Sequence, residues 1–256
     1  MGDLVSGALD AQLVDVASRH SATGRFVRLR ISPVDALIAG IASGGEFGCV
    51  IAPASTLPAE LWSLLVAREP VCLVANLEND SVTDFVLYTE SSIDQADSAA
   101  QALFKRGKSD SEIVNNKIIS VFWPVPKIVI VGTGPNAQAL RESAALLGWQ
   151  TVITSDAGSA QGVIAGVSAL DSIVIMIHDL DIAGAALSAA LSSNAGYIGA
   201  LGSKRMQETR AEWLAYRGIT DLTRIHGPAG INIGAKTPAE IAISILAQAL
   251  SVVKLG

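Results

Sequence analysis

The chain has 256 residues and half of them are hydrophobic, so it is long enough to bury a substantial core as one large domain or two small ones. Its net charge of −6, from 18 Lys and Arg against 24 Asp and Glu, argues against general nucleic-acid binding. No apolar run approaches the roughly 18 residues of a membrane helix, and the first residues lack the basic flank and apolar centre of a signal peptide, so we expect a cytoplasmic protein with no membrane partner.

The first half of the chain predicts a small α+β domain. Helices are expected at 3–19 and 57–69, and a polar segment, 91–116, is expected to contain a third helix and to end in a charged linker. Short β-favouring runs predict strands at 25–32, 36–42, 47–53, 71–78 and 85–90. Pro124 and Pro126 flank a single residue and mark a boundary, so we expect an N-terminal domain at 1–122 and a second domain at 123–256.

From Lys127 onwards, buried strands alternate regularly with helices. Strands are expected at 127–131, 150–156, 171–178, 195–202 and 222–226. Helices are expected at 135–148, 181–194, 203–218 and 237–253, the last opened by a capping box of Thr237 and Glu240. This alternation predicts an α/β fold with a Rossmann-like, doubly wound parallel sheet.

A glycine-rich turn follows the first of these strands. Gly132 and Gly134 stand where a Rossmann turn lets a phosphate approach the backbone, with Ala137 in place of the third glycine. Asp156 lies at the end of the next strand, where a carboxylate would bind a ribose hydroxyl and repel a 2′-phosphate. The alternative is that the turn keeps its glycines for helix packing and binds nothing.

The third strand of the series ends in a histidine and two acids. His178 is a candidate acid, base or ligand, oriented by Asp179 or Asp181. Equally, either acid can cap the following helix while His178 serves only as a residue at the sheet edge.

The fourth strand runs into four residues suited to an anion, Gly202, Ser203, Lys204 and Arg205. The glycine permits close approach, the serine can cap the helix, and two cations stand where the helix dipole already favours negative charge. The alternative is an ordinary capped helix with solvated cations.

A long loop rich in small residues precedes the last helix. Loops of this kind at the carboxyl edge of a sheet are usually binding loops. The candidate contacts are His226, Gly230, Asn232 and Lys236.

Together these four stretches resemble the C-terminal Rossmann domain of the XdhC/CoxI family of molybdoenzyme accessory proteins. The segments "YIGALGSKR" and "HGPAGINIGAKTPAEIAISILAQ" carry most of the resemblance, which spans roughly 127–252. It implies a protein that binds the molybdenum cofactor, an anionic pterin, and delivers it to a xanthine dehydrogenase-type or carbon monoxide dehydrogenase-type enzyme, commonly as a homodimer.

The N-terminal half departs from that family. Relatives show a Gly-Gly-Cys-x-Glu motif, whereas here Cys49 is displaced from the glycine pair. The second domain departs at one place, where Gly158 stands two positions after Asp156 and relatives often have an arginine. Cys49 is either a thiol that contacts metal or sulfur or, as we favour, a buried core residue.

These observations predict a cofactor-binding maturation factor. Two alternatives stay open at this point: an NAD-dependent oxidoreductase with His178 as acid or base, and a scaffold that docks onto a partner without any small ligand.

Overall fold

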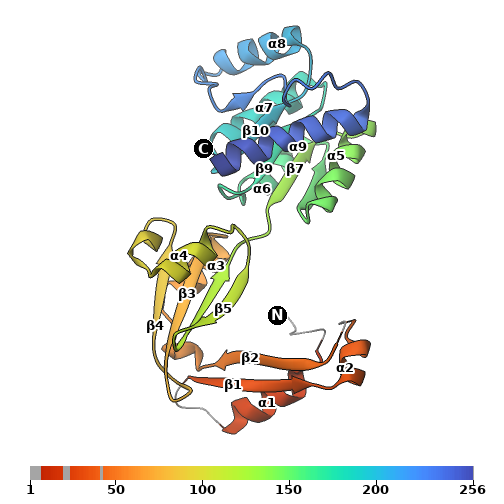
Figure 1. The fold of residues 1–256 in the computed structure, drawn as a ribbon. Coiled ribbons are helices and arrows are strands. Elements are labelled where there is room, and N and C mark those ends of the chain that lie inside the picture. Colours follow the sequence, from red (N-terminus) through yellow and green to blue (C-terminus); the bar gives the residue numbers. More distant parts are fainter. Residues whose placement is uncertain (1–6, 20–23, 41–42, 256) are drawn as a thin grey trace. The chain divides into compact units, whose positions relative to one another are not determined.

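The chain folds around two separate sheets. The structure, a computed structural model, describes residues 7–19, 24–40 and 43–255. Contacts between residues divide the chain into a unit of residues 1–124 and a unit of residues 125–256 (Figure 1).

The N-terminal unit contains an antiparallel sheet with the strand order β2-β1-β4-β3-β6-β5. Its strands are β1 (Arg25–Ile31), β2 (Gly45–Ile51), β3 (Val71–Glu78), β4 (Ser81–Thr89), β5 (Asp110–Val114) and β6 (Lys117–Phe122). Its helices are α1 (Asp10–Arg19), α2 (Pro33–Ile38), α3 (Leu61–Val66) and α4 (Ser98–Phe104), with 3₁₀ turns at Ala54–Thr56 and Ile93–Gln95. The first five residues of β3 are buried, which explains their continuous apolar run.

The strand predicted at 36–42 is wrong, because residues Pro33–Ile38 form the helix α2. The Ser32 hydroxyl accepts a hydrogen bond from the Asp35 N–H at 3.1 Å, and Pro33 occupies the first helical turn. This local capping outweighs the β-propensity of the segment. Residues 41 and 42, and residues 3–6 of the predicted first helix, lie outside the described residues.

The charged linker predicted before residue 117 is also wrong, since β5 and β6 form a hairpin there. Its two turn residues, Asn115 and Asn116, have φ angles of +48° and +59°. Asparagine tolerates this left-handed backbone, which suits the tight turn of a hairpin.

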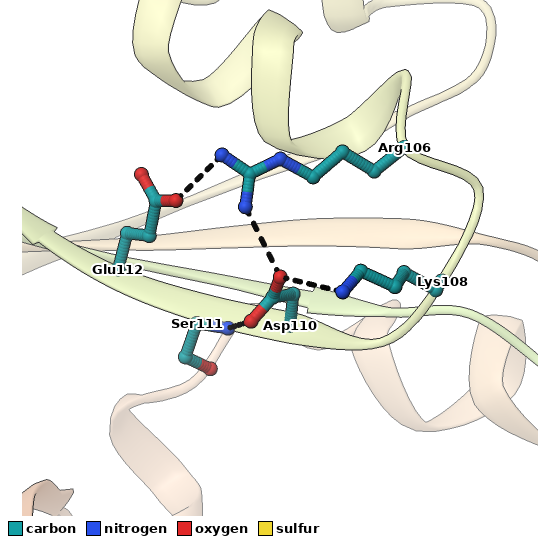
Figure 2. A network of polar contacts seen from close by, with 5 residues as sticks. All are labelled: Arg106, Lys108, Asp110, Ser111 and Glu112. Carbon is teal, nitrogen blue, oxygen red and sulfur yellow. Dashed lines mark hydrogen bonds and ion pairs between the residues drawn. The ribbon is translucent and has the colours of Figure 1, made fainter.

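Charged side chains hold the first residues of β5 (Figure 2). Arg106 donates to Asp110 at 3.1 Å and lies 2.7 Å from a Glu112 carboxylate oxygen, while Lys108 lies 3.4 Å from Asp110. A hydrogen bond from the Ser111 N–H, followed by the two cations, lowers the pKa of Asp110. The charges of this segment therefore pair with one another along a strand.

The C-terminal unit contains a parallel sheet with the order β11-β10-β9-β7-β8. Its strands are β7 (Lys127–Val131), β8 (Gln150–Thr154), β9 (Ser172–Ile175), β10 (Tyr197–Ala200) and β11 (Ile225–His226). Its helices are α5 (Pro135–Leu146), α6 (Ala157–Ile164), α7 (Leu180–Leu191), α8 (Lys204–Ala215) and α9 (Pro238–Leu255). The predicted fold class, a Rossmann-like parallel sheet with a smaller α+β part before it, is confirmed, although the sequence analysis missed α6.

Helices cover both faces of the parallel sheet (Figure 1). Ile128 and Ile130 of β7 share a buried cluster with α5 and α9, whereas Val129 and Val131 share one with α6, α7 and α8. All four of these side chains are fully buried. The strand order reverses between β7 and β9, and ligands of open α/β sheets bind at such a switch point, beyond the carboxyl ends of the strands.

Candidate functional site

The turn after β7 lies against the segment that leaves β9. Gly132 has a φ of +137°, and a Cβ at this position would come within 3.0 Å of the Ile177 backbone nitrogen. Gly134 has a φ of +93° and precedes α5, with open space where a Cβ would stand. Gly132 thus serves close packing, whereas Gly134 leaves the start of α5 accessible.

Asp156 caps the helix that the sequence analysis missed. Its carboxylate accepts a hydrogen bond from the Ser159 N–H at 2.8 Å, and this contact lowers the pKa of Asp156. An aspartate before a helix is a common cap, which was the signal for α6. The contact between Asp156 and a ribose stays a prediction. Its carboxylate already accepts a hydrogen bond from the backbone.

The acids after β9 are likewise engaged away from His178. Asp179 caps α7 by accepting from the Ile182 N–H at 2.9 Å, and Asp181 accepts from the Trp213 indole at 2.8 Å. Within the described residues neither acid forms a hydrogen bond with His178, so nothing there orients the imidazole for acid-base chemistry.

A pocket lies between the segment after β9 and the first turns of α8. It has a volume of about 280 Å³ and is lined by His178, Leu180, Ser203, Arg205, Met206, Thr209 and Arg210. The Ser203 hydroxyl caps α8 by accepting from the Met206 N–H at 3.3 Å, and Gly202 before it has a φ of +141°. The structure thereby brings together His178, Ser203 and Arg205, which the sequence places on two different strand ends. We call this cavity the α8 pocket.

Lys204 lines a different cavity. This second space, of about 340 Å³, is largely apolar and is bounded by side chains of Leu187, Leu214, Leu222 and Ile225. Consecutive helical residues point about 100° apart, so Lys204 and Arg205, the two cations in the first turn of α8, line different cavities. We call this second space the apolar cavity.

Arg210 is a charged member of the α8 pocket that the sequence did not single out. It is only 2 % exposed and also lines the apolar cavity. Its guanidinium donates to the carbonyl oxygens of Leu201 and Ile177, both at 2.8 Å, and burial lowers the pKa of Arg210. The sequence does carry a signal for the burial of Arg210. This residue precedes Leu214 by four positions and so lies on the same buried face of α8.

The predicted contacts His226, Gly230, Asn232 and Lys236 lie at the end of β11 and in the loop before α9, and none of them lines the α8 pocket in the described structure. His226 stacks on Tyr197, and the Gly230 N–H donates to Gln248 of α9 at 2.7 Å. The Asn232 side chain accepts from the Gly234 N–H at 3.3 Å, closing a turn, and Lys236 is exposed. These residues order the loop, and their contact with a ligand stays a prediction.

Cys49 lies in β2, half-buried against an apolar cluster that contains Leu29 and Ile31. Burial raises the pKa of the Cys49 thiol, which disfavours the thiolate that binds metal. Among the described residues no group of three or more His, Cys, Asp or Glu side chains could hold a metal ion. The geometry therefore gives the metal interpretation of Cys49 no support.

The domain that carries the α8 pocket matches a known family. The model of the XdhC Rossmann domain matches residues 128–249. The chain contains an XdhC Rossmann domain. The resemblance that the sequence predicted is thereby confirmed.

Two curated relatives from Escherichia coli K12 match the chain over about half of its length. The uncharacterised protein YqeB is 31 % identical over 156 residues, covering 52 % of this chain and 28 % of YqeB. The molybdenum cofactor insertion chaperone PaoD is 31 % identical over 136 residues, covering 51 % of this chain and 41 % of PaoD. The matches thus span less than half of either relative.

A solved structure resembles the chain over its full length. A crystal structure described as a xanthine dehydrogenase from Bacillus halodurans aligns with a TM-score of 0.50 and 23 % identity, covering 100 % of this chain and 83 % of the other. At this identity the likeness shows the fold alone. The comparisons give no support to NAD as a ligand, and no helix of the described residues has the length and apolar character needed to cross a membrane.

Proposed function

We propose that this protein binds the molybdenum cofactor and delivers it to a molybdoenzyme of the xanthine dehydrogenase or carbon monoxide dehydrogenase type. The observation that carries the proposal is the α8 pocket, where Arg205 and the start of a helix stand beside His178. PaoD, with which the chain shares 31 % identity, is a molybdenum cofactor insertion chaperone, and this supports the same cargo.

The α8 pocket has the chemistry to hold a phosphate-bearing pterin by its anionic end. The first backbone N–H groups of a helix lack partners within the helix, and the helix dipole favours negative charge there. Arg205 is exposed and adds a two-pronged, charge-assisted grip, while His178 offers a ring nitrogen as a further hydrogen-bonding group. No residue of the pocket has to act as an acid or a base for this role.

The size of the pocket suits a carrier that must release its cargo. Its volume of about 280 Å³ is below the roughly 300 to 1,000 Å³ of pockets that bury most of a drug-sized ligand. The pterin rings and the metal would then stay outside, accessible to a client enzyme. The homodimer and the cytoplasmic location that the sequence led us to expect remain predictions, the first open to light scattering of the purified protein.

The proposal is tested by measuring the cofactor that co-purifies with the protein. The protein is purified from a host that makes abundant molybdenum cofactor, then denatured, and the fluorescence of the released pterin is measured. We expect pterin from the wild-type protein and much less from Arg205→Ala. A wild-type protein that yields no pterin would contradict the proposal and favour a docking scaffold without a small ligand.

A further inference from the structure

Arg210 connects the two backbone segments that build the α8 pocket. Its acceptors are the carbonyl of Ile177, the residue before His178, and the carbonyl of Leu201, two residues before Ser203. One guanidinium on α8 therefore fixes the spacing between the segments that leave β9 and β10. A fork of donors in fixed geometry suits this task better than a lone ammonium.

Among the described residues, only neutral dipoles compensate the charge of Arg210. Besides the two carbonyls, it donates to the side-chain oxygen of Gln207 at 3.4 Å. Within the described residues no carboxylate forms an ion pair with it. A buried charge is costly unless it is paired, because the protein interior solvates an ion far less well than water does. Arg210 is nevertheless 98 % buried, and its atoms line the α8 pocket.

We propose that Arg210 is the buried counter-charge for a phosphate group seated in the α8 pocket, and that it positions the two segments that enclose that group. The inference rests on the proposed function, since it names the part of the cargo that this pocket recognises. The exposed Arg205 then closes on the phosphate from the solvent side, while Arg210 supplies a fixed charge from the interior. A charge in a poorly solvated site acts more strongly on an anion than the same charge in water.

The experiment measures inorganic phosphate binding to the full chain by calorimetry, with chloride at equal ionic strength as the reference. Arg210→Met removes the charge and keeps an unbranched stem, whereas Arg210→Lys keeps a charge and loses the fork. Arg141→Ala, an exposed arginine of α5 outside the pocket, is the matched control. We expect Arg210→Met to lose about ten- to a hundredfold in phosphate affinity, the range for charged hydrogen bonds, Arg210→Lys to lose less, and the control to bind like wild type.

A purely structural role predicts a different pattern. Arg210→Met would then melt at a lower temperature and bind phosphate with unchanged affinity, which overturns the inference. If Arg210→Met does not fold, Arg210→Lys decides: a loss of phosphate affinity as large as that of Arg205→Ala would show that the charge at this position is not what matters. A loss in Lys204→Ala that exceeds the loss in Arg205→Ala would place the anion in the apolar cavity and also overturn it.

Two outcomes separate the role of Arg210 from the identity of the cargo. A wild-type protein that binds no phosphate but releases pterin on denaturation overturns the role of Arg210 and leaves the cargo intact. A protein that binds phosphate through Arg210 and carries no pterin keeps the anion site and contradicts the cargo.

Discussion

The imidazole of His226 lies nearly parallel to the ring of Tyr197, with the ring centroids 5.0 Å apart and the planes inclined by 19°. The Tyr197 hydroxyl donates to the Gln248 side-chain oxygen at 2.7 Å, and the same oxygen accepts from the Gly230 N–H. Strands β10 and β11, the loop before α9 and α9 itself are therefore joined at one place. Such a junction gives the loop a fixed base beside the carboxyl edge of the sheet.

This stack predicts a pH dependence of stability. Burial lowers the pKa of His226 from its ordinary value of 6.5. The imidazole of His226 therefore takes up a proton more readily in the unfolded chain than in the folded one. Its contribution to the free energy of unfolding is fully present above pH 6.5 and is lost as the pH falls through the lower pKa of the folded state. His226→Phe keeps a stacked ring and removes the titration. We expect the difference in melting temperature between about pH 7.5 and about pH 5 to be smaller in this variant, and an equal difference would contradict the interpretation.

The same loop depends on a glycine that has no room for a side chain. Gly230 has a φ of +100°, and a Cβ there would come within 2.3 Å of the Ser244 hydroxyl, which donates to the Ile231 carbonyl. Gly230→Ala should cost about 2 kcal/mol or more, from left-handed backbone strain and the displaced hydrogen bond. Gly234→Ala is the control, since its φ is +74° but the space is open. Urea unfolding should show a larger loss in the free energy of unfolding for Gly230→Ala than for Gly234→Ala. Equal losses would mean that the Ser244 side chain moves aside at no cost.

The parallel sheet could be predicted well because its strands are buried on both faces. A strand of this kind is a short apolar run between turn formers, and the range expected for β7 agrees with its observed bounds, Lys127–Val131. The capping box of α9 was also predicted correctly, since Glu240 accepts from the Thr237 N–H at 2.9 Å. Local signals of this kind do not depend on the rest of the fold.

Other features could not be found in the same way. Helix α6 contains Gly158 and Gly162, both poor helix formers, so its only clear signal was the cap Asp156, which the sequence analysis assigned to a ligand. The meeting of His178 with Arg205 follows from adjacent parallel strands, whereas the burial of Arg210 depends on how α8 packs against two strand ends. Sequence patterns therefore gave the exposed part of the pocket and missed its interior charge.

Cys49 provides a test of the N-terminal unit. Its side chain packs against an apolar cluster, so Cys49→Ser should lower the free energy of unfolding by about 1 kcal/mol or more, the cost of burying a hydroxyl without a partner. The pterin retained per folded protein should not change. Cys49→Ala separates the polar penalty from the lost volume. A variant with wild-type stability and less pterin would show that the thiol contacts the cargo.

The two neighbouring cations of α8 offer the sharpest comparison for the cargo itself. Arg205 lines the α8 pocket and Lys204 lines the apolar cavity. Arg205→Ala should therefore weaken binding of a phosphate-bearing pterin by roughly 1.5 to 3 kcal/mol, or about ten- to a hundredfold in dissociation constant. Lys204→Ala should weaken it less, because Lys204 lines the other cavity and carries a lone ammonium in place of a two-pronged guanidinium.

The measurement is pterin affinity at two salt concentrations, beside a thermal melt of each variant. The melting temperatures should hardly change, because an exposed cation in the first turn of a helix is mildly unfavourable against the dipole. Arg205→Ala should also reduce the salt dependence of pterin binding, since the substitution removes one direct contact between charges. Equal losses in the two variants would point to a diffuse positive field at the start of α8. If Arg205→Ala binds like wild type with an unchanged melting temperature, the arginine is a solvated surface residue and the cargo lies elsewhere.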